Sequence, residues 1–145
     1  MSKVLLDTNI VVSGLFRSGL PSKLLHKARK GEIKAVSSSG LLAELSEVLT
    51  RESKPFRLTQ DEADKVIDHV CSWCEIVSVG ALPNVCRDRD DNLVLATAEA
   101  GKVDYVITGD SDLLELGIYR GVRLVKVSTF FSELGDREAW EEAIP

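Results

Sequence analysis

Acidic side chains recur along this sequence at positions where they could share a metal ion. These acids are Asp7, Glu44, Asp91 and Asp110, with Asp88, Asp90 and Asp112 close by in the sequence. Clustered carboxylates repel one another unless a proton or a cation neutralises them. Oxygen ligands without an accompanying histidine favour Mg²⁺ or Mn²⁺ over zinc. Because such ions keep coordination positions open for water and phosphate oxygens, the pattern indicates phosphoryl chemistry.

Short apolar runs bounded by polar residues predict the strands that would position these acids. We expect five strands, at 4–6, 33–36, 76–79, 105–108 and 123–127. Apolar residues at helical spacing predict helices over about 10–16, 21–30, 39–50, 60–71, 91–100, 113–116 and 130–134. This alternation predicts an α/β fold, a three-layer α/β/α sandwich around a mostly parallel five-stranded sheet. Right-handed crossovers would bring the carboxyl ends of the parallel strands, and the acids that follow them, to one edge where ligands bind.

Several of these acids also have structural explanations. Asp88, Asp90 and Asp91 compete for the role of N-cap or dipole partner of the following helix, so one or two of them are expected to be structural. Asp110 and Asp112 could cap the next short helix. Glu44 borders an apolar helical stripe, where a glutamate usually faces water. By contrast, Asp7 ends a buried strand and has few structural explanations, which favours a functional role.

Length and composition predict one globular domain. The chain has 145 residues, 44% hydrophobic and 28% charged, and we assign 1–134 to the domain and 135–145 to a short C-terminal tail. The net charge of −5 argues against avid non-specific binding of nucleic acid, but it allows an enzyme that meets a polyanion through a metal ion. We expect no membrane span, because no apolar run reaches ~18 residues. Three cysteines without a secretory signal favour the cytoplasm.

Other polar groups are less informative. The pair Cys71 and Cys74 at a helix end has no second pair, so a structural or incidental explanation is favoured over zinc or redox chemistry. His26 and His69 are expected at ordinary surface positions. Basic residues gather on the early helices, namely Lys23, Lys27, Arg29, Lys30 and Lys34, with Arg51, Lys54 and Arg57. We name Lys23, Lys27 and Lys30 as candidate RNA contacts, with a solvated helix face as the equally weighted alternative.

Four ordered elements of this chain resemble the PIN-domain ribonucleases, the fold of the VapC-type toxins of bacterial and archaeal toxin–antitoxin pairs. The elements are Leu6-Asp7-Thr8-Asn9, then Glu44, then Asp88-Arg89-Asp90-Asp91-Asn92 with Val94-Leu95-Ala96-Thr97-Ala98, and finally Val106-Ile107-Thr108-Gly109-Asp110-Ser111-Asp112-Leu113. Their order and spacing agree over about residues 3–131. Leu113 and Arg89 depart from the common pattern, where many relatives have Phe and Pro, and these departures leave the subfamily and the RNA target open.

The resemblance implies roles for individual residues. It makes Asp7, Glu44, Asp91 and Asp110 catalytic carboxylates that bind one or two Mg²⁺ or Mn²⁺ ions, with Asp112 as an additional metal ligand. Thr8, Asn9, Asp88 and Thr108 would be polar groups that support these ligands. The implied reaction is hydrolysis of an RNA phosphodiester that leaves a 5′-phosphate and a 3′-hydroxyl. The implied partners are a small cognate antitoxin and a second copy of the chain.

Two other functions remain as alternatives. A haloacid-dehalogenase-like phosphatase would also place Asp7 after its first strand, and Gly109-Asp110-Ser111-Asp112 is similar to the late acidic motif of that family. However, its nucleophile needs a second aspartate two residues on, where this chain has Asn9, and the expected lysine is not evident. A non-catalytic, Mg²⁺-binding signalling or RNA-binding module is the other alternative, although retention of all four acids argues against it.

Overall fold

The protein is described here from a computed structural model that covers residues 1–52 and 55–142. Its elements are β1 (Lys3–Leu6), α1 (Thr8–Phe16), α2 (Leu20–Arg29), β2 (Lys34–Ser38), α3 (Ser39–Thr50), α4 (Gln60–Cys71), β3 (Cys74–Val77), α5 (Arg89–Gly101), β4 (Tyr105–Ile107), α6 (Ser111–Leu116), β5 (Ile118–Tyr119), β6 (Val122–Val125) and α7 (Val127–Glu142). None of the helices in the described part of the chain has the length and apolar character needed to cross a membrane.

The strands form one six-stranded sheet in the order β3-β2-β1-β4-β6-β5. All neighbours pair in parallel except β5, which runs antiparallel to β6. Strands β2 and β3 lie on one side of β1 in the sheet, and β4 and β6, which come later in the chain, lie on the other side. The order therefore reverses between β1 and β4, which is where open α/β sheets form their ligand crevice.

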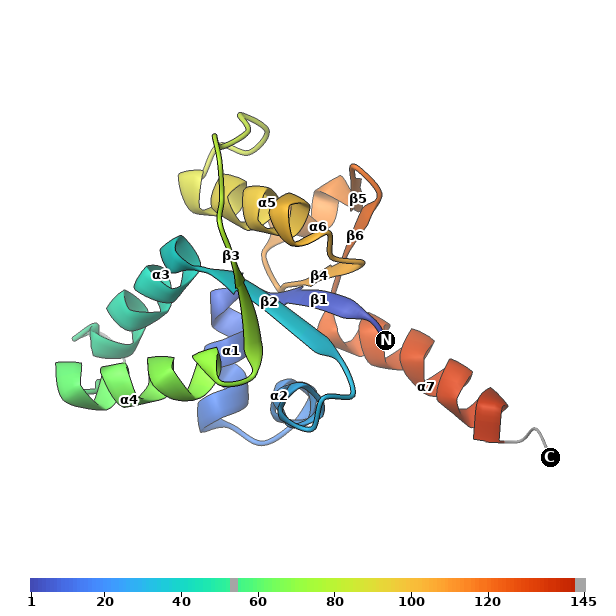
Figure 1. Ribbon diagram of the computed structural model, residues 1–145, viewed down its shortest axis with the longest axis horizontal. Coiled ribbons are helices and arrows are strands. Elements are labelled where there is room, and N and C mark those ends of the chain that lie inside the picture. Colours follow the sequence, from blue (N-terminus) through green and yellow to red (C-terminus); the bar gives the residue numbers. More distant parts are fainter. Residues whose placement is uncertain (53–54, 143–145) are drawn as a thin grey trace.

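Helices cover both faces of the sheet, as the sequence predicts. Figure 1 shows α5 and α6 above the sheet and α1, α2 and α7 below it. Successive strand residues point to opposite faces of the sheet. Leu5 and Val106 therefore pack in the core between the sheet and α5, whereas Val4 and Ile107 pack in the core between the sheet and helices α1 and α2. Because both faces are buried, the strands read as continuous apolar runs.

Close packing fixes α5 against the sheet. Gly101, the last residue of α5, is buried, and a Cβ atom there would lie 2.6 Å from Val36 Cγ1 on β2. Only glycine permits this approach, which sets the position of the helix that carries Asp91.

The structure adds one strand to the five predicted. β5 pairs with β6 through a hairpin whose two turn residues, Arg120 and Gly121, have φ angles of 48° and 84°. Positive φ at both positions suits a tight hairpin. Two residues are too few to show an alternating pattern, so the sequence does not reveal this strand.

The chain's end also differs from the prediction. Helix α7 begins at Val127 and continues to Glu142, whereas the sequence predicts a helix over 130–134 followed by a tail. Much of the predicted tail is therefore helical, and residues 143–145 lie outside the described residues. The assignment of 135–145 as a separate tail stays a prediction.

Candidate metal centre

Asp7 is held at the point where the strand order reverses. It is 8% exposed, follows β1 directly and caps the amino end of α1. Its Oδ1 accepts a hydrogen bond from the Thr8 backbone N–H at 2.8 Å, and its Oδ2 accepts one from Thr108 Oγ1 at 2.7 Å. Burial raises the pKa of Asp7, an effect that the Thr108 hydrogen bond opposes. Both oxygens are thus fixed in orientation between the ends of β1 and β4.

Three aspartates come together beside it. One carboxylate oxygen each from Asp91, Asp110 and Asp112 lies within 4.8 Å of the others. Asp91 is buried in the first turn of α5, whereas Asp110 and Asp112 are half-buried at the start of α6. Burial, followed by the charge of Asp110, raises the pKa of Asp91 to about 6. The cluster is therefore costly to ionise fully without a cation.

The loop after β4 orients Asp110. Its Oδ1 accepts hydrogen bonds from the backbone N–H groups of Asp112 at 2.8 Å and Leu113 at 3.1 Å, which makes it the N-cap of α6. Its own backbone N–H donates to Thr108 Oγ1 at 3.0 Å. Thr108 is buried and accepts from Asp110 while it donates to Asp7, so one hydroxyl links the two acids.

Glu44 faces the same region from α3 but lies outside the three-aspartate cluster. Burial raises its pKa to about 7, helped by the negative charges of Asp90 and Asp7 and opposed by a hydrogen bond from the Thr8 side chain. The sequence places Glu44 at the border of an apolar helical stripe, where glutamate is usually solvated. Instead, the structure places it half-buried among other acids.

The site contains buried oxygen atoms that a divalent cation could bind. Within the described residues, Asp91 Oδ2 and Glu44 Oε2 are buried and have no hydrogen-bond partner. A buried acceptor without a partner carries a desolvation cost, which is larger for a charged group. A hard cation would satisfy these oxygens, and an all-oxygen donor set suits Mg²⁺ or Mn²⁺.

The aspartates at positions 88, 90 and 91 have different surroundings in the structure. Asp88 is the exposed N-cap of α5, because its Oδ1 accepts from the Asp90 backbone N–H at 2.8 Å. Asp90 is exposed, whereas Asp91 is 7% exposed. The capping role thus belongs to Asp88, and Asp91 alone of the three is buried in the cluster. Of the predicted supporting groups, Thr8 and Thr108 contact the acids as described above, whereas Asn9 is exposed at the start of α1.

Sequence reasoning missed the loop anchor beside the cluster. Asn92 is buried, and its Oδ1 accepts from the backbone N–H groups of Val85 at 3.2 Å and Cys86 at 2.8 Å. Its Nδ2 donates to the Cys86 carbonyl oxygen at 2.9 Å. The amide next to Asp91 therefore ties the β3–α5 loop to α5, and its position after the acidic run is a sequence signal that could have indicated this role.

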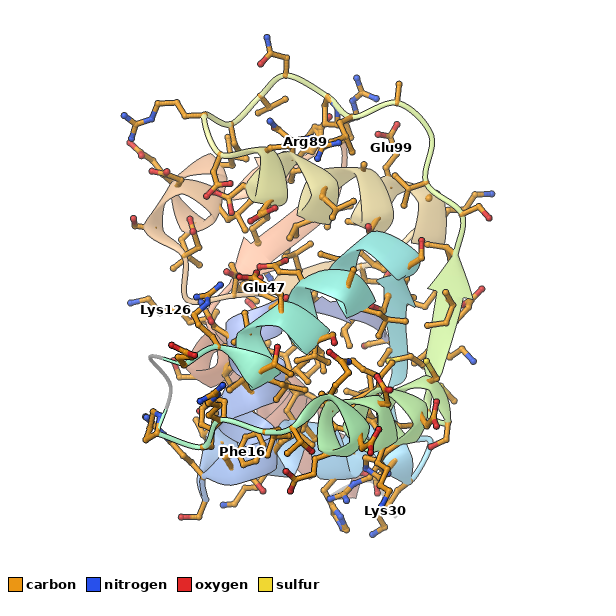
Figure 2. The ribbon with its side chains drawn as sticks, turned by 90° about the vertical axis from the view of Figure 1, so that its left-hand side faces the viewer. Phe16, Lys30, Glu47, Arg89, Glu99 and Lys126 are labelled. Carbon is orange, nitrogen blue, oxygen red and sulfur yellow. The ribbon has the colours of Figure 1, made fainter. Side chains whose placement is uncertain are left out.

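A groove adjoins the acids and was also missed. It encloses about 500 Å³ between α3, the β3–α5 loop and the start of α5. Glu44 and Asp90 line it together with Glu47 and Arg89. Figure 2 shows Glu47 on α3 below α5, which carries Arg89. A local sequence pattern cannot predict such a groove, because its walls come from three separate parts of the chain.

The predicted basic contacts lie elsewhere. Lys23 and Lys27 line a separate groove of about 410 Å³ with His26 and Phe131. Lys27 Nζ lies 3.2 Å from Glu32 Oε2, so part of this charge is paired. In Figure 2, Lys30 lies at the opposite end of the view from Arg89. Lys54 lies outside the described residues.

The structure shows no activated thiol at Cys74, the more buried member of the cysteine pair. Cys71 is exposed, Cys74 is half-buried, and both are free thiols. Burial raises the pKa of Cys74 to about 12, so this thiol is protonated at neutral pH and is a poor nucleophile. The structural or incidental explanation of the pair fits this geometry.

Comparisons with known proteins agree on one fold. A family model described as PIN domain matches residues 3–112. The complex VapBC2 of Rickettsia felis, crystallised with a DNA fragment from its promoter, contains a chain with 19% identity and a TM-score of 0.60; the match covers 84% of this chain and 96% of that one. PAE2754 of Pyrobaculum aerophilum has 15% identity and a TM-score of 0.59, with 94% and 90% covered. No curated protein matches the sequence.

Proposed function

The chain belongs to the PIN domain family, and from that premise we propose that it is a metal-dependent endoribonuclease that hydrolyses RNA phosphodiester bonds. The observation that carries the proposal is the group of buried Asp91 with half-buried Asp110 and Asp112 at the crevice of the sheet, with Asp7 beside it. Such a group of carboxylates suits a cation that meets phosphate oxygens. RNA is the substrate class that the family resemblance in the sequence implies.

We assign separate roles in this reaction to the residues of the site. Asp91, Asp110 and Asp112 would hold one Mg²⁺ or Mn²⁺ ion through their oxygens. We expect Asp7 and Glu44, which interact electrostatically with each other, to share this ion or to hold a second one. When bound, the cation would supply Lewis-acid activation of the phosphodiester and of the attacking water. Thr8 and Thr108 would keep the Asp7 oxygens in place. Glu44, with a pKa of about 7, would hold or release a proton at Oε2.

We also propose that the protein acts in the cytoplasm as the toxin of a toxin–antitoxin pair. This rests on the family resemblance and on the VapBC2 complex among the proteins of similar fold. A small antitoxin that covers the crevice and a homodimeric assembly follow from the same resemblance. Size-exclusion chromatography with light scattering, on the protein expressed alone and with its genomic neighbour, tests both: a dimer and a stable complex are expected, and a monomer without a partner would contradict them.

The central experiment is cleavage of a panel of labelled RNAs with Mg²⁺, Mn²⁺ or EDTA. The wild-type protein should cut with either metal and not with EDTA. Asp7→Asn and Asp91→Asn should lose cleavage by about 100-fold or more, because each removes a charged oxygen from the centre. Asn remains a good helix N-cap, so Asp7→Asn should keep its fold.

Asp61→Asn is the matched control. Asp61 is an exposed aspartate in the first turn of α4, as Asp91 is an aspartate in the first turn of α5. This variant should cut like the wild type. Metal-loaded wild type that cuts none of the RNAs, or an Asp91→Asn variant with wild-type activity, would overturn the proposal and favour the non-catalytic binding module.

A further inference from the structure

The groove beside the acids has the size and walls of a binding site for a nucleobase. Its volume of about 500 Å³ lies within the range of small-molecule pockets, about 300–1,000 Å³. Val79, Leu82 and Leu93 are half-buried apolar side chains among its lining residues. Apolar walls offer contact to the flat face of a base, which is how proteins commonly hold unstacked nucleotides.

Small residues line the groove along α3. Gly40 and Ala43 line it one turn apart, and a Cβ atom at Gly40 would lie only 2.9 Å from Leu93 Cδ2. Any side chain at Gly40 would therefore press on the opposite wall. Ala43 is exposed within the groove, so a larger side chain there would fill the space without disturbing the core.

The charge of the groove selects against a phosphate and for a hydrogen-bond donor. Glu44, Glu47 and Asp90 line it, whereas Arg89 is the one basic residue among the described residues of its lining. Glu47 is exposed, and its Oε1 accepts from Arg51 Nη2 at 2.8 Å, which orients the carboxylate. Carboxylates accept hydrogen bonds from exocyclic amino groups of bases, as glutamate does from cytosine N4. Adenine, cytosine and guanine carry such an amino group, and uracil does not.

The groove borders the acidic centre at Glu44 and Asp90. Glu44 lines the groove and interacts electrostatically with Asp7, and Asp90 lines it while interacting with both. A strand with one phosphate at the carboxylates would therefore have the neighbouring base within reach of the groove. Arg89, at the first position of α5, lines the groove and would be the charge that pairs with a phosphate of this strand.

We propose that this groove binds the base next to the scissile phosphate of a single-stranded RNA and prefers a base with an exocyclic amino group, with Glu47 as the selecting side chain. The inference rests on the proposed ribonuclease function, which it deepens by assigning the substrate's conformation and base preference. Filling the groove from Ala43 should weaken RNA binding.

Binding is measured apart from cleavage, on a chain that carries Asp91→Asn. Short labelled oligo(A), oligo(C) and oligo(U) are titrated by fluorescence anisotropy. Oligo(A) and oligo(C) should bind more tightly than oligo(U), and adding Ala43→Leu should weaken oligo(A) binding about tenfold, since stacking of one base typically contributes that much. Ala100→Leu is the matched control, because Ala100 is an exposed alanine on α5 outside the groove lining.

The selecting role of Glu47 has its own test. Glu47→Gln should narrow the difference between oligo(A) and oligo(U), because the Gln amide can also donate to uracil O4. Glu99→Gln is the control: Glu99 is likewise an exposed helical glutamate paired with an arginine, Arg120 Nη1 at 2.7 Å, and it lies outside the groove lining. Glu99→Gln should leave the preference unchanged.

Cleavage by wild-type protein distinguishes this inference from the proposed function. Cutting that Ala43→Leu and Glu47→Gln leave unchanged in rate and base preference would overturn the inference and leave the ribonuclease intact. Equal binding of the three oligonucleotides would also overturn it. A wild type that cuts no RNA, yet binds oligo(A) through a groove that Ala43→Leu blocks, would overturn the nuclease and support the base site.

Discussion

Replacing Asp91 by asparagine should make the metal-free protein more stable while it abolishes the metal site. The structure gives the sign, because burial and Asp110 raise the pKa of Asp91 from 3.8 to about 6. A carboxyl group whose pKa is higher in the folded state than in the unfolded chain costs stability once it ionises. Its cost is absent below the unfolded pKa and reaches its full value as the pH rises past the folded one.

The magnitude follows from the same values. A pKa of about 6 against 3.8 corresponds to about 3 kcal/mol of destabilisation at pH 7, at about 1.4 kcal/mol per pH unit. Asp110 and Asp112 are half-buried, so water and salt screen part of their repulsion, and we expect a gain of about 1–2 kcal/mol for Asp91→Asn. For a chain of this size that is a rise in melting temperature of about 3–6 °C.

Thermal unfolding in EDTA at pH 7 and at pH 4.5 measures this effect. Asp91→Asn should melt higher than wild type at pH 7, and the difference should shrink at pH 4.5, where native Asp91 is mostly protonated. Saturating Mn²⁺ should stabilise wild type and not the variant, because a cation that binds only the folded state raises its stability.

Asp61→Asn serves as the control, and it should lose a few tenths of a kcal/mol through the weaker helix-dipole interaction. The reasoning would be refuted by an Asp91→Asn protein that melts at or below wild type at pH 7. A gain of equal size at both pH values would also refute it, since ionisation would then not be the cause.

Three further results are expected. Thr108→Val removes the hydroxyl that donates to Asp7 and accepts from Asp110, so denaturant unfolding should show a loss of about 1–3 kcal/mol and RNA cleavage should fall; unchanged cleavage would contradict its orienting role. Gly101→Ala would bring a Cβ atom within 2.6 Å of Val36 Cγ1 and should cost about 1–3 kcal/mol in urea unfolding, whereas no change would mean that α5 shifts freely. Mn²⁺ affinity should weaken about tenfold or more between pH 8 and pH 6, because Glu44 has a pKa of about 7 and its proton competes with the metal. Isothermal titration calorimetry measures this affinity, and Glu44→Gln should make it depend less on pH. An Mn²⁺ affinity that falls as steeply with pH in Glu44→Gln as in wild type would exclude Glu44 as the source.

The sequence could predict the sheet and the position of the acids because both follow from short-range patterns. β1 and β4 are apolar runs that end in polar residues, and the topology rule for parallel strands places those ends at one edge. The sequence alone could therefore predict that Asp7, after β1, and Asp110, after β4, lie at the same edge of the sheet. The capping box at Thr59 and Glu62 is a local signal of the same kind, and the structure contains both of its hydrogen bonds.

Features that depend on tertiary packing could not be predicted in this way. Asp88, Asp90 and Asp91 are equivalent by local rules, and only the docking of α5 on β2 buries Asp91 and leaves Asp88 as the cap. The groove is a further example, since Glu47 and Arg89 line it from helices about 40 residues apart in the sequence. Helical spacing correctly places Glu47 in water, but it does not show which residues lie opposite it.

The acids of the proposed metal centre differ in how their neighbours hold them. Asp7 caps α1, Asp110 caps α6, and the Thr108 hydroxyl joins the two, so these side chains have structural partners that hold them in place. Asp91 and Glu44, by contrast, each retain a buried oxygen without a partner among the described residues. The unsatisfied oxygens of the site thus belong to two side chains that lack such partners. In the proposed metal centre, a divalent cation would gain binding free energy by pairing with these two oxygens.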